Sequence, residues 1–368
     1  MLILKPAQRK VHNIFGLWAR ILNFRLSLSV NTNLVATMIL DVARHKFYEG
    51  FLTLAIMTLV MIAVMVFSLD NSEIAPASPF MSLVTTTIKG GYFIERAAAI
   101  VMYVVSVLTL ARSAIRTHIY PTNTMAPLAL CTMIMFPLIC TGNTLHQSTI
   151  TLLTAIALGN MFYCFGPHRY TNRLFISMVA ASALLVVDAS FIAIPVALCI
   201  ALILARKRFR EAIVAITGMV LPIFTQCYVL WLVGREPSTI ATQLWHDITA
   251  PWSFDIIANF GYIVEHITLP HLIFVALLII MQGVSSILYL TQRDIHSSVM
   301  RGVWRALHLI WVVALCSAFM LPTSTWMLLT IALIATSTML PMLFVRSNVV
   351  LSTLAYIALI GCAVAPII

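Results

Sequence analysis

The sequence has very little charge for its length. Only 9% of the 368 residues are Asp, Glu, Lys or Arg, and 61% are hydrophobic, whereas about 25% charged residues are usual in a soluble domain. A soluble protein of this composition would lack the polar side chains needed to cover its surface. The composition therefore excludes an ordinary soluble enzyme or binding domain and indicates a protein whose solvent is lipid.

Several motifs are also missing. No Walker motif, GxSxG, HExxH or usable GxGxxG is present, which argues against an ATP-driven pump on this chain alone. The seven cysteines form no CxxC pair and have no zinc-type spacing, so we interpret them as small buried hydrophobic residues and predict no metal site. No cleavable signal peptide is evident, and the first apolar run is expected to act as an uncleaved signal.

What the sequence does have is a series of apolar runs long enough for membrane helices, each of which needs roughly 20 apolar residues. They predict an all-α, polytopic transmembrane bundle of about eleven spans, with residues 174–205 alternatively forming two half-depth helices that meet at Asp188. The runs are 51–69, 97–111, 125–141, 147–165, 174–187, 189–205, 213–234, 272–290, 303–321, 325–344 and 348–366.

The basic residues orient these spans. With a cytoplasmic N-terminus and an outer C-terminus, 19 of the 22 Lys and Arg residues fall on the inner side, and Lys89, Arg96 and Arg235 fall on the outer side. The net charge of +10 thus sits in the breaks between spans and not on one basic face with aromatics, which excludes a nucleic-acid partner. The chain is thus predicted to cross a membrane many times, with its basic breaks on the cytoplasmic side.

The acidic residues show the opposite bias, which insertion rules do not explain. Four are inner, namely Asp41, Glu49, Glu211 and Asp294. The other eight are outer: Asp70, Glu73, Glu95, Asp188, Glu236, Asp247, Asp255 and Glu265.

Three segments fall outside the spans. Residues 1–50 form a basic cytoplasmic segment in which 11–24 predict an amphipathic helix, lying on the membrane surface or packed on another subunit, and 51–368 form one transmembrane domain. The connections 70–96 and 235–271 are longer than two adjoining helices require. The second predicts interfacial helices broken at Pro251 and Pro270.

Two groups of outer residues are candidates for catalysis. Asp70 and Glu73 follow the first span three residues apart, where they can act as a general base or simply end the helix. Asp188 lies in the apolar stretch ALLVVDASFIAIP, so it either faces a cavity, as expected for an intramembrane carboxylate, or caps the next helix together with Ser190.

Further outer residues are candidates for binding. Lys89 and Arg96 could hold a phosphate, or Arg96 could pair with Glu95. A set of His and acidic residues in the second long connection has no spacing typical of a metal cage and is interpreted as solvated loop residues. Its members are His246, Asp247, Asp255, Glu265, His266 and His271.

A resemblance adds to these interpretations. The stretch LFISMVAASALLVVDASFIAIPVALCIALILARKRFREAIVAITGMVLPIF, with its Arg breaks and its Gly218–Pro222 segment, resembles an uncharacterised family of polytopic inner-membrane proteins from Bacteroidetes. Its hydropathy rhythm is also similar to the membrane core of C-superfamily lipid-dependent glycosyltransferases. That resemblance implies a polyprenyl-phosphate-linked sugar as donor, Asp70 and Glu73 in the place of the superfamily's acidic pair, and Lys89 or Arg96 at the phosphate. The chain departs from the pattern in having DNSE instead of a compact acidic pair and no soluble outer domain.

Three classes of function remain open at the sequence level. The first is an outer-face, glycosyltransferase-like enzyme of the cell envelope that uses a lipid-linked sugar. The second is a non-catalytic envelope assembly component, and the third is a transporter or lipid flippase that uses the break at Asp188 and a kink at Pro222. The sequence names no cofactor and no protein partner.

Overall fold

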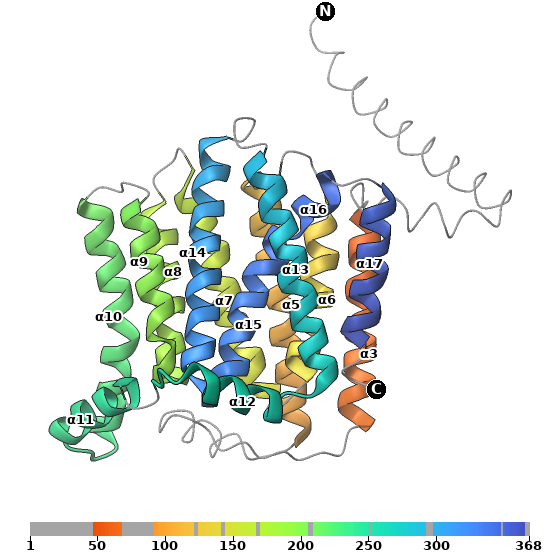
Figure 1. Ribbon diagram of the computed structural model, residues 1–368. Coiled ribbons are helices and arrows are strands. Elements are labelled where there is room, and N and C mark those ends of the chain that lie inside the picture. Colours follow the sequence, from red (N-terminus) through yellow and green to blue (C-terminus); the bar gives the residue numbers. More distant parts are fainter. Residues whose placement is uncertain are drawn as a thin grey trace, which may run out of the picture.

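The architecture is a bundle of helices, seen in a computed structural model of the chain (Figure 1). The structure describes residues 47–67, 92–120, 124–140, 144–166, 170–204, 209–249, 252–291, 297–346 and 349–364. Within these residues every regular element is a helix and there is no β-strand. The all-α prediction is confirmed for this part of the chain.

Most helices run along the bundle side by side (Figure 1). The chain reverses between them at the two ends of the bundle, except that α16 continues the segment of α15. The helices are α3 (Phe47–Phe67), α5 (Tyr92–Arg116), α6 (Ala126–Cys140), α7 (Thr144–Cys164), α8 (Thr171–Val187), α9 (Ala193–Leu204), α10 (Phe209–Leu232), α13 (Leu269–Thr291), α14 (Ser298–Met320), α15 (Thr325–Met339), α16 (Pro341–Arg346) and α17 (Val349–Val364). Two short 3₁₀ helices, η2 (Ala189–Ile192) and η4 (Pro322–Ser324), lie at reversals.

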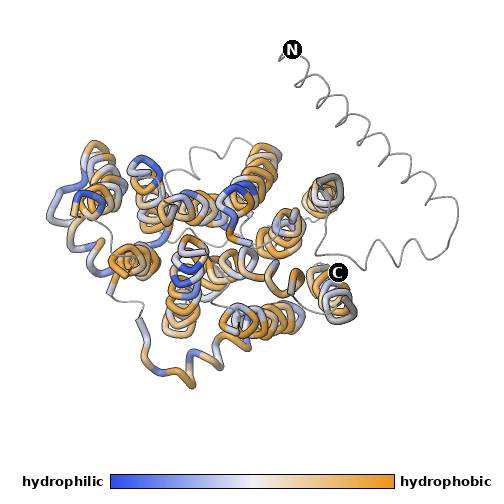
Figure 2. The backbone as a smooth tube through the Cα atoms, turned by 90° about the horizontal axis from the view of Figure 1, so that it is seen from above, coloured by the Kyte–Doolittle hydropathy of each residue, from blue (hydrophilic) through white to orange (hydrophobic). Residues whose placement is uncertain are grey.

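The long helices are compatible with an integral membrane protein. Among the described residues, five helical segments are long and apolar enough to cross a bilayer. They are 94–116, 209–232, 269–291, 298–320 and 322–345, and several further apolar helices are shorter. Viewed down the bundle, hydrophobic residues cover most of the helices (Figure 2), as expected where side chains contact lipid.

The centre of the bundle is occupied by α15, which packs against α6, α7, α13 and α14. Its side chains are nearly all buried although it carries several threonines. Several of these hydroxyls bond within the helix: Thr336 Oγ1 donates to the Ala332 carbonyl (3.0 Å) and Thr338 Oγ1 to the Ala335 carbonyl (2.7 Å). Bonding to the carbonyl one turn earlier satisfies a buried hydroxyl without a partner helix.

Two helices do not follow the bundle axis. α11 (Pro237–Thr249) and α12 (Ile256–His266) lie across one end of the bundle (Figure 1). The expectation of helices in this connection is therefore confirmed. Pro251 lies outside the described residues, but Pro270 does not break a helix. It is the second residue of α13, where a missing amide hydrogen costs nothing because the first turn has no partner for it.

The helix bounds refine two other predictions. The second apolar run was expected at 97–111, but α5 extends to Tyr92–Arg116 because Glu95, Arg96 and Arg116 join the ends of the helix. The run 174–205 forms two helices that meet at Asp188, as both alternatives predicted, and each is shorter than the five candidate spans. At 1.5 Å per residue, the 17 residues of α8 reach about 25 Å, and the chain reverses at Asp188 into η2 and α9.

Charged residues gather at the two ends of the bundle. Arg116 ends α5, and Arg173, Arg210 and Arg301 lie in the first turns of α8, α10 and α14; we call this the basic end. At the opposite end, which we call the acidic end, lie Glu95, Asp188, Glu236, Asp247, Asp255 and Glu265. The amphipathic helix predicted at 11–24 lies outside the described residues.

Candidate functional site

The acidic end contains a group of buried polar side chains at two chain reversals. Asp188 closes α8 and caps η2, while Ser324 lies at the junction of η4 and α15. Asp188 is 8% exposed and both carboxylate oxygens accept hydrogen bonds: Oδ1 from the Ser190 amide (2.9 Å) and Oδ2 from the Ser324 hydroxyl (3.0 Å). The carboxylate therefore links the α8–α9 reversal to the α14–α15 reversal.

Histidines from two further helices lie near this carboxylate or next to η4. His146, at the start of α7, is buried and lies within electrostatic reach of Asp188. His271, in the first turn of α13, packs edge-on against Trp326 with ring centroids 5.0 Å apart and bonds through Nδ1 to the Thr268 hydroxyl. We define the Asp188 cluster as Asp188, Ser190, His271, Ser324 and Trp326.

The cluster retains hydrogen-bonding capacity. Three of its buried polar atoms have no partner among the described residues: Ser190 Oγ, His271 Nε2 and Trp326 Nε1. Buried polar atoms are rarely left unpaired, because an unmade hydrogen bond costs about 1–3 kcal/mol. A ligand with hydroxyl or amide groups could satisfy them.

The two lateral helices cover these reversals. α11 packs against η2, and α12 packs against η4 and the end of α14. The Asn259 side chain anchors α12, since its Nδ2 donates to the carbonyls of Ser253 (3.0 Å) and Phe319 (2.9 Å). The Ser253 amide in turn donates to the Met320 carbonyl at 2.9 Å. The cover is thus held by hydrogen bonds to the bundle.

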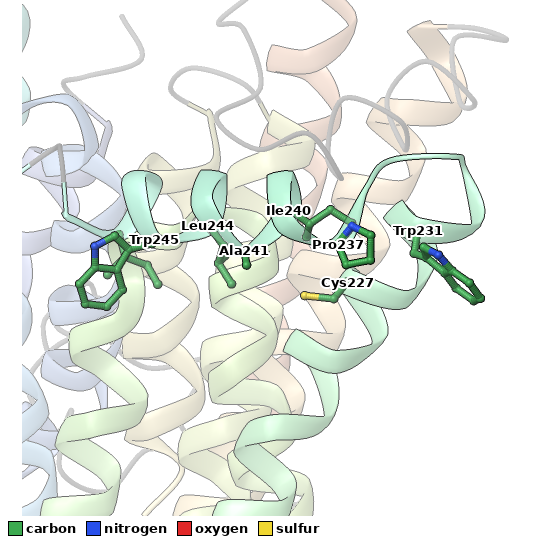
Figure 3. A pocket seen from close by; sticks show the side chains of 8 residues that line it. Cys227, Trp231, Pro237, Ile240, Ala241, Leu244 and Trp245 are labelled. Carbon is green, nitrogen blue, oxygen red and sulfur yellow. The ribbon is translucent and has the colours of Figure 1, made fainter.

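An apolar groove adjoins the same cover (Figure 3). It lies between the end of α10 and the face of α11 that points down in Figure 3, and it has a volume of about 260 Å³. Figure 3 shows Cys227 of α10 reaching toward Pro237 and Ile240 of α11. The groove is lined by Cys227, Trp231, Pro237, Ile240, Ala241, Leu244, Trp245 and Ile248.

A cation marks one end of this groove. Arg235 lies in the turn between α10 and α11, which Gly234 makes possible with its positive φ of 94°. Its guanidinium Nη1 donates to Oε1 of Gln243, a residue of α11, at 3.1 Å. An exposed guanidinium of this kind suits a phosphate. The sequence interpretation assigned Arg235 only an orienting role.

The sequence-predicted site is only partly described. Asp70, Glu73 and Lys89 lie outside the described residues. Arg96 lies in the first turn of α5 at the acidic end. For Asp188, the observed hydrogen bonds are those of the predicted cap, with Ser324 as an additional partner.

The interpretation of His271 as a solvated loop residue was wrong, because it is 8% exposed in the first turn of α13. Ser324 and Trp326 were missed because no sequence motif connects them with Asp188. The other loop residues singled out from the sequence are dispersed: His246 Nδ1 lies 3.9 Å from Oδ1 of its neighbour Asp247, and Asp255 caps α12 through the Ala258 amide. Among the described residues, no group of three or more His, Cys, Asp or Glu side chains could hold a metal ion. All seven cysteines are free.

Comparison of the chain with protein-family models, curated proteins and solved structures found no match in any of the three. The fold and the Asp188 cluster therefore have to be interpreted from their own chemistry. What they establish is a helical protein compatible with a lipid bilayer, with a buried polar cluster next to an apolar groove.

Proposed function

We propose that this chain is a bacterial inner-membrane protein of about eleven spans, with its N-terminus in the cytoplasm, that recognises a lipid-linked polar group at its outer face. The observation that carries this is the position of α11. α11 packs on η2, next to the Asp188 cluster, and the residues of α11 from Pro237 to Ile248 form the apolar groove with the end of α10. The same helix thus packs on η2 next to buried polar side chains and forms one wall of a hydrocarbon-lined groove.

A polyprenyl-phosphate-linked sugar has the matching chemistry. Its hydrocarbon chain suits a groove lined by Trp231, Leu244 and Trp245, and its phosphate suits Arg235 or the predicted cations Lys89 and Arg96. Its hydroxyls suit the unpaired atoms of Ser190, His271 and Trp326. The family resemblance to inner-membrane proteins of Bacteroidetes and to C-superfamily glycosyltransferases is part of this proposal.

Filling the groove tests the binding step. The variant A241W places an indole among the groove residues, whereas I257W adds the same indole on α12 at a position that is already 86% exposed. With a photoreactive polyprenyl phosphate as probe, we expect A241W to lower cross-linking to the purified protein at least fivefold and I257W to leave it unchanged. Equal cross-linking of both variants would count against the groove.

Glycosyl transfer is the catalytic form of the proposal, with Asp70 or Glu73 as general base. The double variant D70A/E73A should then change the glycan composition of the cell envelope, because no carboxylate remains to accept the proton of the acceptor hydroxyl. An unchanged composition, together with intact probe binding, would instead favour the non-catalytic envelope component.

A further inference from the structure

A serine and a histidine face each other near the basic end, far from the Asp188 cluster along the helices. Ser286 lies on α13, five residues before its end, and His308 lies on α14. His308 Nε2 is 2.8 Å from Ser286 Oγ, and His308 Nδ1 is 2.8 Å from the Trp304 carbonyl oxygen. Both side chains are half-buried.

The hydrogen-bond partners fix the proton positions. A carbonyl oxygen only accepts, so Nδ1 of His308 carries the hydrogen that it donates to Trp304. In the neutral ring, Nε2 then accepts, and the Ser286 hydroxyl donates to it. A nucleophile, a base and a group that orients the base are thus arranged as in serine hydrolases, with a backbone carbonyl as the orienting group.

Other polar atoms surround this pair. Gln282 Nε2 donates to Ser286 Oγ at 3.2 Å, which holds the hydroxyl in place. The Trp304 ring lies 5.6 Å from the His308 ring, and its Nε1 is buried without a hydrogen-bond partner among the described residues.

Cations lie directly above the pair on the same helix. Arg301, Arg305 and His308 are spaced by four and three residues, so they share one face of α14. At 1.5 Å per residue, His308 lies about 4.5 Å deeper along the helix than Arg305. A glycerophospholipid has the same order, with its phosphate outermost and its acyl esters just below.

The serine is also accessible from the lipid side. Gly283 lies one turn before Ser286, and a Cβ atom at 283 would meet nothing within 4 Å. The neighbouring Ile287 and Leu290 are each 62% exposed, as expected for side chains in contact with acyl chains. The face of α13 next to Ser286 is therefore uncovered by other described helices, and this face would contact lipid.

From this geometry we propose that Ser286 and His308 cleave acyl esters of anionic phospholipids in the leaflet at the basic end. Ser286 Oγ attacks the ester carbonyl while its proton moves to His308 Nε2. The carbon–oxygen bond to the glycerol breaks, and that oxygen takes the proton from His308, which leaves an acylated serine. Water then gives a proton to His308 and attacks the acyl group, releasing a fatty acid and restoring the serine. The net reaction consumes one water and yields a lysophospholipid.

The same hydrogen bond could merely join α13 to α14, since serine and histidine often link membrane helices. Labelling of the purified full-length protein with a fluorophosphonate separates the two roles, because an activated serine attacks the phosphorus, displaces fluoride and becomes phosphonylated. We expect label on Ser286, its loss in S286A, and at least tenfold less in H308Q. The matched control is S285A, because Ser285 is the adjacent buried hydroxyl and donates to the Met339 carbonyl (2.8 Å).

Vesicles of phosphatidylglycerol test the substrate. Fatty acid release by the wild-type protein should exceed that of S286A at least tenfold, and R301A/R305A should reduce release from phosphatidylglycerol more than from phosphatidylcholine. Absence of label on Ser286, or release that is equal for wild type and S286A, would overturn the proposal and leave the helix-joining role. Circular dichroism melts of each variant exclude loss of fold as the cause.

Discussion

At the scale of single residues, Asp188 is a buried carboxylate whose hydrogen bonds join two chain reversals at the acidic end. Its two oxygens accept hydrogen bonds from the Ser190 amide and from the Ser324 hydroxyl, and all three groups are buried. Removing the carboxylate would leave both donors unsatisfied in an apolar surrounding, and each such loss costs about 1–3 kcal/mol. Asp188 therefore contributes to stability whether or not the cluster binds a ligand.

D188A should accordingly lower the free energy of unfolding by about 2–4 kcal/mol, and D188N by less because the amide oxygen keeps one acceptor. Thermal unfolding in mild detergent measures the difference. The control is D247A: Asp247 has 35% of its side chain exposed, and its loss should change stability by less than about 0.5 kcal/mol.

The partner of Asp188 gives a second check on the same contact. In a double-mutant cycle, the double variant D188A/S324A should lose less free energy of unfolding than the sum of the losses in D188A and S324A. Either single change already breaks the shared hydrogen bond. Strict additivity would mean that the Ser324 hydroxyl and the carboxylate do not interact, and the link between the two reversals would have to be abandoned.

Of the two hydrogen bonds that Asp188 accepts, only the local one could be predicted from the sequence. The stretch around Asp188 predicted an isolated carboxylate that either faces a cavity or caps a helix, and the bond to the Ser190 amide is local enough to follow from the sequence. Ser324 lies 136 residues further on. Its contact with Asp188 depends on how the α8–α9 and α14–α15 reversals pack against each other. A single sequence contains no information on the distance in space between these two reversals.

At the scale of elements, α8 and α10 pack closely because Gly218 has no side chain. A Cβ atom at 218 would lie 2.9 Å from the Phe175 carbonyl oxygen and 3.0 Å from Met178 Cβ, both on α8. Because α8 and α10 lie this close together, the Ser182 hydroxyl can donate to the Gly218 carbonyl at 3.3 Å. Small residues permit such contacts between membrane helices, where packing and not the hydrophobic effect drives association.

G218A should therefore destabilise the protein although alanine is the better helix former by about 1 kcal/mol. G218L should be worse and should separate α10 from the bundle. Gly361 on α17 is the matched control: a Cβ there meets nothing within 4 Å, so G361A should be neutral or stabilising. Unfolding temperatures in detergent compare the variants, and a G218A protein as stable as G361A would contradict the close packing.

The helices were largely predictable because the length of an apolar run is itself the requirement for a membrane helix. Each predicted run between 51 and 366 overlaps a helix of the described chain. The ends were less predictable: α5 is longer than its apolar run because long charged side chains can reach the polar layer from the last turns of a helix. The lateral direction of α11 and α12 follows from their amphipathic pattern, whereas their contacts with η2 and η4 do not.

At the scale of the whole molecule, the separation of charge along the bundle axis is the main evidence for orientation. The described arginines at the starts of α8, α10 and α14 lie at one end and the acids of α11 and α12 at the other. Positive residues are retained on the cytoplasmic side during insertion. We therefore expect the basic end, with Ser286 and His308 below it, to face the cytoplasm and the Asp188 cluster to face outward.

Cysteine labelling tests this orientation directly. Glu236 and Arg210 are both exposed and lie at opposite ends of α10 and its following turn. With a membrane-impermeant maleimide, E236C should react in intact cells, whereas R210C should react only after the membrane is opened. The wild-type chain gives the background of its seven native cysteines. If R210C reacted in intact cells, the orientation assigned to the protein would have to be reversed. The Asp188 cluster would then face the cytoplasm, and the basis for recognition of an outer lipid-linked sugar would be lost. Ser286 and His308 would in that case lie in the outer leaflet.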